Sequence, residues 1–136
     1  MKANSTVFQS IIDSVEAGIW VVGRDLTVEW INTRVYNYLG IPRSSVIKGG
    51  HCYRQILGNE GVCEGCPSLR TFETGRPEYL EFRRELDGEL RHYRLTATPL
   101  WKKGQETFSQ VIEMIQDVTV QKRTEDDLRR LNRFNE

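Results

Sequence analysis

Residues 78–118 read EYLEFRRELDGELRHYRLTATPLWKKGQETFSQVIEMIQDV and predict most of a β-sheet. We expect strands at residues 78–86, 89–101 and 106–118, because β-branched and aromatic residues are frequent in each segment. Asp87-Gly88 tolerates the positive φ angles of a two-residue hairpin turn, and residues 102–105 provide the second turn. This stretch therefore predicts a three-stranded antiparallel meander.

Alternation within the first of these strands indicates how the sheet is covered. Leu80, Phe82 and Leu86 share one parity, whereas charged side chains such as Glu81 and Arg83 occupy the other. A strand with this pattern has one face on the core and one face in water. We therefore expect helices to cover a single face of the sheet.

The segment before residue 78 adds two more strands. Residues 18–22 and 26–31 are β-branched and aromatic runs, and residues 23–25 suit a tight reversal between them. The tryptophans of these runs, Trp20 and Trp30, are interpreted as packing residues. Together with the meander, this hairpin completes a five-stranded antiparallel sheet.

Helices are expected between and around the strands. Residues 5–16 place apolar side chains at helical spacing, with Ser5 or Thr6 available to cap the first turn. We expect Asn32 to cap a short helix through residue 38, and residues 68–74 to form another. The 136 residues thus suit one α+β domain, in which short helices cover one face of the sheet and further helices flank it at both ends.

Composition and charge exclude several classes of protein. Nineteen basic side chains balance nineteen acidic ones, so no overall field attracts the chain to nucleic acid or to an anionic membrane. No apolar run approaches the roughly 18 residues that a membrane span needs, and the first residues lack a signal-peptide core. We therefore expect a cytoplasmic segment with no direct nucleic-acid binding and no membrane insertion. Its three cysteines, an odd number, then argue against a disulfide scaffold and for reduced thiols, metal ligation or a redox role.

Residues 49–67, here called the cysteine loop, contain all three cysteines and one of the two histidines. His51, Cys52, Cys63 and Cys66 could supply the four ligands of a zinc ion or an iron–sulfur cluster. His51 and Cys52 are adjacent, however, so their side chains diverge in an extended segment. Two alternatives remain open: the cysteines pack the loop without doing chemistry, or they form a reversible thiol switch.

Other chemistry is not indicated. Pro67 follows Cys63-x-x-Cys66 at the position where covalent haem needs a histidine, so covalent haem is excluded. An independent thiol oxidoreductase is disfavoured, because such enzymes place the first cysteine at a helix start beside a parallel βαβ unit. No Ser/His/Asp set or glycine-rich phosphate loop occurs in the sequence. We expect no enzymatic activity from this segment.

Residues 120–136 are highly charged and contain no glycine or proline. Val120, Thr124, Leu128 and Leu131 fall at four- and three-residue intervals, which predicts an amphipathic helix with a narrow apolar seam. Such a helix is too short and too polar to be stable alone. We expect the seam to contact a partner helix, as in a homodimer, and the helix to link the domain to an output domain.

In this order the elements resemble a PAS domain, the sensory module of bacterial signalling proteins, over about residues 8–119. The resemblance rests on residues 12–19 (IDSVEAGI), Asn32 after the second strand, Leu39-Gly40, Asp87-Gly88 and the closing triplet Asp117-Val118-Thr119. This triplet is similar to the Asp-Ile-Thr motif of the family, and the resemblance implies that it passes the signal to the outgoing helix. It also implies an amphipathic helix at 1–16, a sensory core at 17–119 and a linker or coiled-coil helix at 120–136.

The cysteine loop resembles that of PAS domains in histidine kinases and in activators that work with the alternative sigma factor. The shared features are Cys52-Tyr53, Cys63-x-x-Cys66-Pro67 and Thr74-Gly75. The residues around Cys52 also look superficially like the flavin-photosensor motif. Tyr53 intervenes before the arginine, His51 replaces an asparagine, and the later strands lack the amides that would bind a flavin ring. We therefore do not expect flavin.

The resemblance implies a regulatory role. The expected function is a cytoplasmic PAS sensor that controls a downstream output module, with a sensor histidine kinase as the first expectation. A diguanylate cyclase or a sigma-factor-dependent transcriptional activator is the alternative parent. The expected signal is a small ligand, or a metal or redox change at the cysteine loop. The competing expectation is a ligand-free PAS domain that serves only for dimerisation and spacing.

Overall fold

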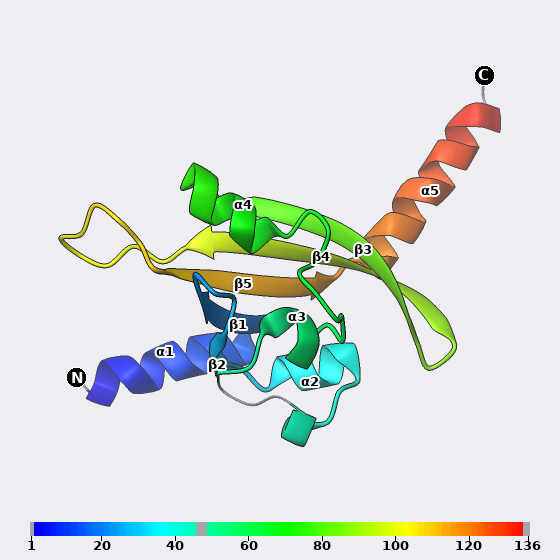
Figure 1. Ribbon diagram of the computed structural model, residues 1–136. Coiled ribbons are helices and arrows are strands. Elements are labelled where there is room, and N and C mark those ends of the chain that lie inside the picture. Colours follow the sequence, from blue (N-terminus) through cyan, green and yellow to red (C-terminus); the bar gives the residue numbers. More distant parts are fainter. Residues whose placement is uncertain (1, 46–48, 135–136) are drawn as a thin grey trace.

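A five-stranded antiparallel sheet in the order β2-β1-β5-β4-β3 forms the centre of the fold (Figure 1). The computed structural model describes residues 2–45 and 49–134. The strands are β1 (Gly18–Gly23), β2 (Val28–Ile31), β3 (Glu78–Leu86), β4 (Glu89–Pro99) and β5 (Gln110–Asp117). The predicted α+β fold class is confirmed.

The meander forms as the sequence predicts, and its last strand becomes central. Asp87 and Gly88 take φ angles of 53° and 77°, which are the angles that a two-residue hairpin turn of this kind requires. β3 then pairs with β4, and β4 pairs with β5. The free edge of β5 pairs with β1, so the two halves of the chain join through β5. The strand that leads into the C-terminal helix therefore lies in the middle of the sheet.

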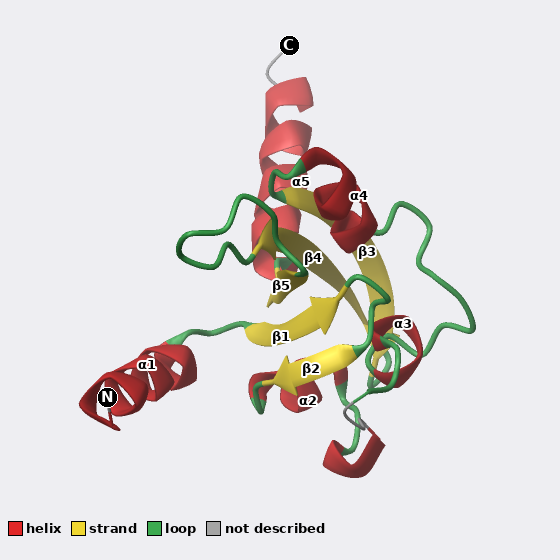
Figure 2. Ribbon diagram, turned by 60° about the vertical axis from the view of Figure 1, so that its left-hand side comes forward, coloured by secondary structure: helices red, strands yellow, loops and turns green. Residues whose placement is uncertain are grey.

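Short helices cover one face of this sheet (Figure 2). They are α2 (Arg34–Leu39), α3 (Cys52–Gln55) and α4 (Pro67–Thr74). The 3₁₀ turn η1 (Arg43–Ser45) follows α2 and exposes Arg43 and Ser44. α4 packs across β3, β4 and β5, and α2 packs on β1. Every second residue of the central strands points into this layer, and the buried core includes Trp20, Val22, Tyr93, Leu95, Val111 and Ile115.

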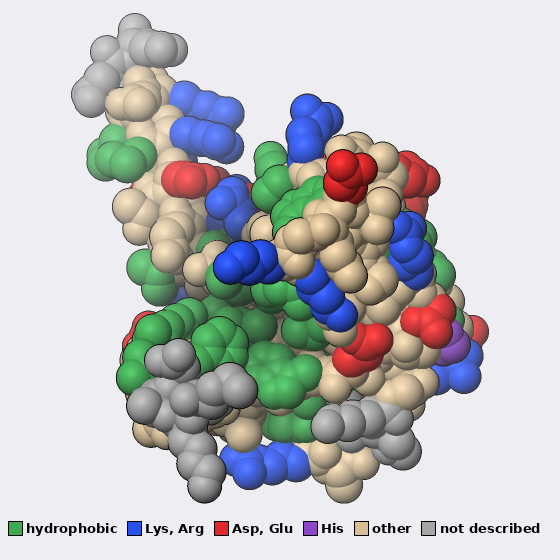
Figure 3. Space-filling model, turned by 90° about the vertical axis from the view of Figure 1, so that its left-hand side faces the viewer, with side chains coloured by type: hydrophobic (Ala, Val, Ile, Leu, Met, Phe, Trp, Pro, Cys, Tyr) green, Lys and Arg blue, Asp and Glu red, His purple; other side chains and the backbone are tan. Residues whose placement is uncertain are grey.

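Two longer helices, α1 (Lys2–Ser14) and α5 (Thr119–Phe134), extend away from the body (Figure 1). α1 exposes Val7, Phe8 and Ile11. Figure 3 views the molecule from the α1 side and shows α5 standing apart from the rest. None of the described apolar side chains of these two helices belongs to the buried core. No helix within the described residues has the length and apolar character to span a membrane.

Several element boundaries differ from the sequence-based expectation. α1 begins at Lys2 rather than at residue 5, so Thr6 lies inside the helix instead of at its start. β2 begins at Val28, because Leu26 has a φ of 65° and belongs to the preceding turn. β5 begins at Gln110 rather than at residue 106. The cause is Phe108, which is buried in the loop and stacks on Phe72 of α4 with ring centroids 5.5 Å apart.

The predicted capping role of Asn32 is wrong. Thr33 occupies the position before α2, and no side chain caps that helix. Asn32 is instead buried, where its Oδ1 accepts a hydrogen bond from the Ile19 N–H at 3.0 Å. Its Nδ2 donates to the Ala17 carbonyl at 3.2 Å. The side chain thus ties the end of β2 to the start of β1, where a cap on α2 would have left both backbone groups unpaired.

We expect Asn32→Ala to lower the free energy of unfolding by about 1–3 kcal/mol, because the substitution leaves buried backbone groups at Ala17 and Ile19 without partners. Urea denaturation followed by circular dichroism measures the change. Asn37→Ala, at an exposed position of α2, is the matched control and should change stability by no more than about 0.5 kcal/mol. Equal effects of the two substitutions would contradict this role for Asn32.

Candidate functional site

The cysteine loop includes α3 and the segment that leads from α3 to the start of α4, and it lies against the covered face of the sheet. Cys52 begins α3, and Cys66 immediately precedes α4, which starts with Pro67. All three thiols are free. Cys52 and Cys66 are buried, whereas Cys63 is half-buried. A hydrogen bond from the Cys66 N–H to the Cys63 carbonyl, at 3.1 Å, closes the turn between these two cysteines.

The structure separates His51 from the cysteines. Its side chain is exposed, and its ring stacks on Tyr53 with the centroids 5.0 Å apart. Among the side chains that the structure describes, no three from His, Cys, Asp and Glu form a group that could hold a metal ion. The arrangement therefore supplies no formed zinc or iron–sulfur site, and metal binding by these four residues stays a prediction.

Burial governs the chemistry of the thiols. Desolvation is the largest cause that raises the pKa of Cys52, Cys63 and Cys66, and the negative charge of Glu113 adds to it in each case. A thiol with a raised pKa stays protonated near neutral pH, whereas a redox nucleophile needs a lowered pKa. These thiols are therefore poor nucleophiles as long as they stay buried.

A buried carboxyl group, Glu113 of β5, contacts this loop from the sheet. Its side chain is only 1% exposed. It accepts hydrogen bonds from Trp20 Nε1, from Ser68 Oγ at 2.6 Å and from the Cys52 thiol. Burial raises the pKa of Glu113, and the three hydrogen bonds partly oppose that rise. Glu113 therefore joins β5, β1, α3 and the start of α4.

The sequence-based prediction did not include Glu113. A signal for it is present, because Val111, Glu113 and Ile115 share one parity along β5 and the other two are fully buried apolar residues. An acidic residue at an inward-pointing position of a central strand is unusual, since buried polar groups need partners. Trp20, interpreted as a packing residue, proves to be one of those partners.

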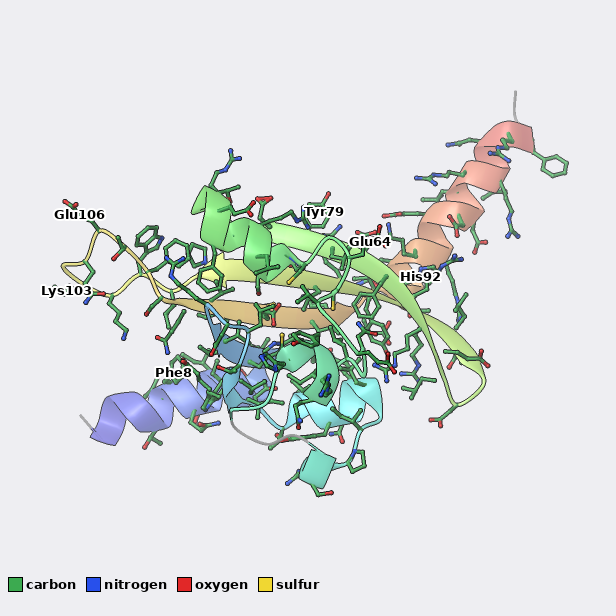
Figure 4. All side chains as sticks on the ribbon, viewed as in Figure 1. Phe8, Glu64, Tyr79, His92, Lys103 and Glu106 are labelled. Carbon is green, nitrogen blue, oxygen red and sulfur yellow. The ribbon has the colours of Figure 1, made fainter. Side chains whose placement is uncertain are left out.

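A cleft of about 440 Å³ opens beside the half-buried thiol. The segment after α3 forms one wall, with Leu57, Asn59 and Cys63, and β3 forms the other. Figure 4 labels Glu64, which also lines the cleft. Asn59 Nδ2 donates a hydrogen bond to Cys63 Sγ at 3.3 Å. The wall on β3 comprises Leu80, Phe82, Arg83 and Arg84. Arg84 shares the parity of Leu80 and Phe82, whereas Arg83 has the water-facing parity, so the cleft combines apolar surface with one arginine side chain.

The predicted transmission residues Asp117, Val118 and Thr119 lie where β5 ends and α5 begins. Asp117 Oδ1 accepts hydrogen bonds from the Thr119 N–H at 2.9 Å and from its hydroxyl at 2.5 Å. The Thr119 hydroxyl oxygen accepts a hydrogen bond from the His92 N–H at 2.9 Å, and the Val118 N–H donates to the His92 carbonyl at 2.8 Å. Asp117 is also 3.6 Å from Arg91. The triplet thus connects the end of β5 to β4 and to the first turn of α5.

Ion pairs hold the base of α5 against the hairpin of β3 and β4. Lys122 Nζ lies 2.9 Å from Glu81 Oε2, and Arg94 lies 2.7 Å from the other oxygen of that carboxylate. Arg123 lies 3.4 Å from Glu89. Lys122 and Arg94 together lower the pKa of Glu81. The helix is therefore anchored at its first two turns and extends outward from there.

The predicted seam residues of α5 are exposed in the isolated domain. Val120, Leu128 and Leu131 are 72%, 56% and 60% exposed, and Thr124 is exposed as well. At 100° per residue these four lie on the side of the helix opposite to Lys122, which faces the body. The seam is thus exposed on one side of the helix, and its contact with a partner helix stays a prediction.

We expect Cys63 to be the first thiol that iodoacetamide modifies, because it is half-buried whereas Cys52 and Cys66 are buried. Since burial raises its pKa above the ordinary value of 9.0, the rate should still increase when the pH passes 9. Intact-mass spectrometry of the native protein follows the reaction.

Cys63→Ser is the matched control, and it should remove the fast phase and leave two thiols that react only on unfolding. Fast modification below pH 7, or reaction of the buried thiols at the same rate as Cys63, would contradict this assignment.

Residues 12–123 match the family described as PAS fold. In a comparison of the sequence with curated proteins, no match was found. The solved structures that resemble this chain include the PAS domain of BvgS from Bordetella pertussis, with a TM-score of 0.58 and 15% identity over 94% of this chain and 96% of that chain.

Two further similar structures come from histidine kinases. A sensory box histidine kinase/response regulator from Burkholderia thailandensis E264 has a TM-score of 0.63 and 19% identity, over 93% of this chain and 95% of that one. The PAS domain of the histidine kinase ThkA has a TM-score of 0.54 and 18% identity, over 76% of this chain and 100% of that chain. At such identities these likenesses show the fold alone. The family match, which covers most of the sequence, shows that the chain belongs to the PAS fold family.

Proposed function

We propose that this PAS domain is a cytoplasmic sensor that controls a downstream output module, most simply a sensor histidine kinase, in bacterial signal transduction. The observation that carries the proposal is the central strand β5. Its buried part contacts the cysteine loop through Glu113, and its end leads through Asp117 into α5, whose seam is exposed. One strand therefore touches both a candidate input and a candidate output.

The input is a small ligand in the cleft or a metal or redox change at the cysteine loop. Both would act at one place, because Cys63 lines the cleft. The volume of about 440 Å³ falls within the range of small-molecule sites, roughly 300–1,000 Å³. Arg84, which shares the parity of Leu80 and Phe82, offers a cationic partner for the carboxylate of a small organic anion. The thiols would respond to oxidants or soft metal ions only after local opening, because burial keeps them protonated.

The output is a change in how two copies of α5 meet. A homodimer would bury Val120, Thr124, Leu128 and Leu131 against the same residues of a second chain, as in a two-stranded coiled coil. A ligand changes the balance between two arrangements of this seam only if it binds them with different free energies. In this proposal Asp117, Val118 and Thr119 transmit that difference, because they join the end of the sheet to the first turn of the helix.

Two questions remain within this proposal: which parent protein carries the domain, and whether the domain senses a ligand at all. Two of the similar structures come from histidine kinases, which supports a kinase parent. A diguanylate cyclase or a sigma-factor-dependent transcriptional activator is the alternative parent. The competing function is a ligand-free domain for dimerisation and spacing, and the exposed seam supports it equally well. The cleft is the feature that favours a sensor over a spacer.

We expect Leu128→Asn combined with Leu131→Asn to weaken homodimer formation by at least about tenfold, since both side chains lie on the exposed seam. Sedimentation equilibrium of the purified chain measures the dissociation constant. Arg129→Asn with Arg133→Asn changes the opposite face of α5 and serves as the matched control. A wild-type chain that stays monomeric, or a control that dissociates equally, would show that the seam does not mediate dimerisation.

Native mass spectrometry of the anaerobically purified chain separates a sensor from a spacer. We expect an additional mass that is released on denaturation, and we expect Leu80→Trp to abolish it because an indole would fill the cleft. Leu90→Trp, at an exposed position of β4, is the control and should retain the mass. A mass that matches a metal and disappears in Cys63→Ser would place the input at the cysteine loop. A bare chain, unchanged in thermal stability by small carboxylates and by Zn²⁺, would favour the spacer.

A further inference from the structure

Glu113 stands out because it is the only carboxylate buried among the side chains that the structure describes. Strand pairing places it between Ala97 of β4 and Trp20 of β1, on the face that the helices cover. Neither of these neighbours titrates. A carboxyl group in such a position loses the solvation that water gives its charged form. Its charge must therefore be supported by the groups that it contacts.

Three hydrogen-bond donors from three different elements point at this carboxyl group. The Trp20 indole N–H comes from β1, the Cys52 thiol from α3, and the Ser68 hydroxyl from the second residue of α4 at 2.6 Å. An indole N–H can only donate, so the oxygen that it contacts must remain an acceptor. A hydroxyl and a thiol can each donate or accept. The second oxygen can therefore carry a proton if Ser68 reverses its hydrogen bond.

Among the side chains that the structure describes, no cation pairs with the buried carboxyl group. None of the ion pairs formed by the described residues includes it. The titratable groups around it are thiols, Cys52 on α3 and Cys63 and Cys66 in the cysteine loop, all neutral near pH 7 because burial raises their pKa values. Glu78 of β3 lies two strands from Glu113, because both residues pair with Ala97 of β4. Glu78 forms an ion pair with Arg70 of α4 at 3.8 Å. That arginine is already engaged.

We propose that Glu113 is a buried proton-binding group whose charge state sets how α3 and α4 pack on β5. The ionised form accepts all three donors and holds both helices to the strand. The neutral form must place a proton on one oxygen, so the contact with Ser68 or the contact with Cys52 changes direction or is lost. Because Cys52 lies near the start of the cysteine loop and Ser68 directly follows its last residue, protonation moves the walls of the candidate input site. This regulatory role rests on the proposed sensor function, whereas proton binding itself does not.

Infrared difference spectra of the 136-residue chain at stepwise pH test proton binding directly. We expect the carbonyl band of a buried, protonated carboxylic acid that disappears as the pH rises above 4.5, the ordinary value for glutamate. The band should be absent in Glu113→Gln and unchanged in Glu81→Gln, which alters an exposed carboxylate whose pKa is lowered. If Glu113→Gln does not fold, Ser68→Ala should shift the same band. A wild-type spectrum without such a band at any pH above 4.5 would overturn the proposal.

Stability gives a second and independent test. Because the folded state raises the pKa of Glu113 above 4.5, the native protein binds the proton more tightly than the unfolded chain does. The free energy of unfolding should therefore fall as the pH rises from 4.5 through the folded pKa, and then level off. Glu113→Gln should abolish this fall, and Glu81→Gln should leave it intact. Equal pH dependence in the wild type and in Glu113→Gln would overturn the proposal.

Hydrogen–deuterium exchange, corrected for the intrinsic effect of pH, locates the structural response. We expect the amides of α3 and α4 to change protection across the Glu113 titration in the wild type and not in Glu113→Gln. Unchanged protection of both helices would overturn the proposal even if the infrared band is present. The amides of α5 report separately on the proposed sensor function. A response in α3 and α4 without one in α5 supports the role of Glu113 and counts against transmission to the output helix.

Discussion

β5 is hydrogen-bonded along both of its edges, to β1 on one side and to β4 on the other. The two halves of the sheet join through this strand, and its fit against β1 leaves little space for an added side chain. Gly18 of β1 pairs with Ile115, and a Cβ atom there would lie 2.7 Å from Ile115 Cγ2 and 2.9 Å from Val35 Cγ2. That is closer than packed atoms approach. The absence of a side chain at this position is therefore what lets β1 and α2 close on the central strand.

The sequence predicted the parts of the fold that local chemistry decides. Asp87-Gly88 predicted the hairpin and the bounds of β3, because a two-residue turn sets the register of both strands. Local chemistry could not place the start of β5. Phe108 lies outside the strand because it stacks on Phe72, which is 36 positions away in the chain. The role of Asn32 was missed for the same reason: its partners at residues 17 and 19 become neighbours only after β1 and β2 pair. The cysteines were found at once, but the burial that makes them poor nucleophiles depends on the folded layers.

The attachment of α5 allows a change of helix orientation. The first residue of the helix is buried and hydrogen-bonded, whereas the ion pairs beyond it are more exposed and weak. Thr119 is buried and bonded to Asp117 and to the backbone of β4, so the start of the helix is fixed. The pairs that Lys122 and Arg123 make beyond this point involve exposed or half-exposed side chains. Such pairs contribute roughly 0–1 kcal/mol each. A seam contact with a second helix, which buries several apolar side chains, can therefore outweigh them and decide the direction of the helix.

Stability alone does not account for Glu113. Val111 and Ile115, two residues before and after it, are fully buried in the same layer, and an apolar side chain of similar size would fill the position without the cost of desolvating a carboxyl group. What the carboxyl group adds is connection, since it is bonded to β1, to α3 and to α4 at once. A hydrophobic contact keeps most of its energy when these helices slide slightly, whereas three hydrogen bonds weaken because they depend on distance and angle. A group of this kind makes the helices that carry the cysteine loop move together with the strand that leads to α5, and that is the coupling a sensor needs between its input and its output.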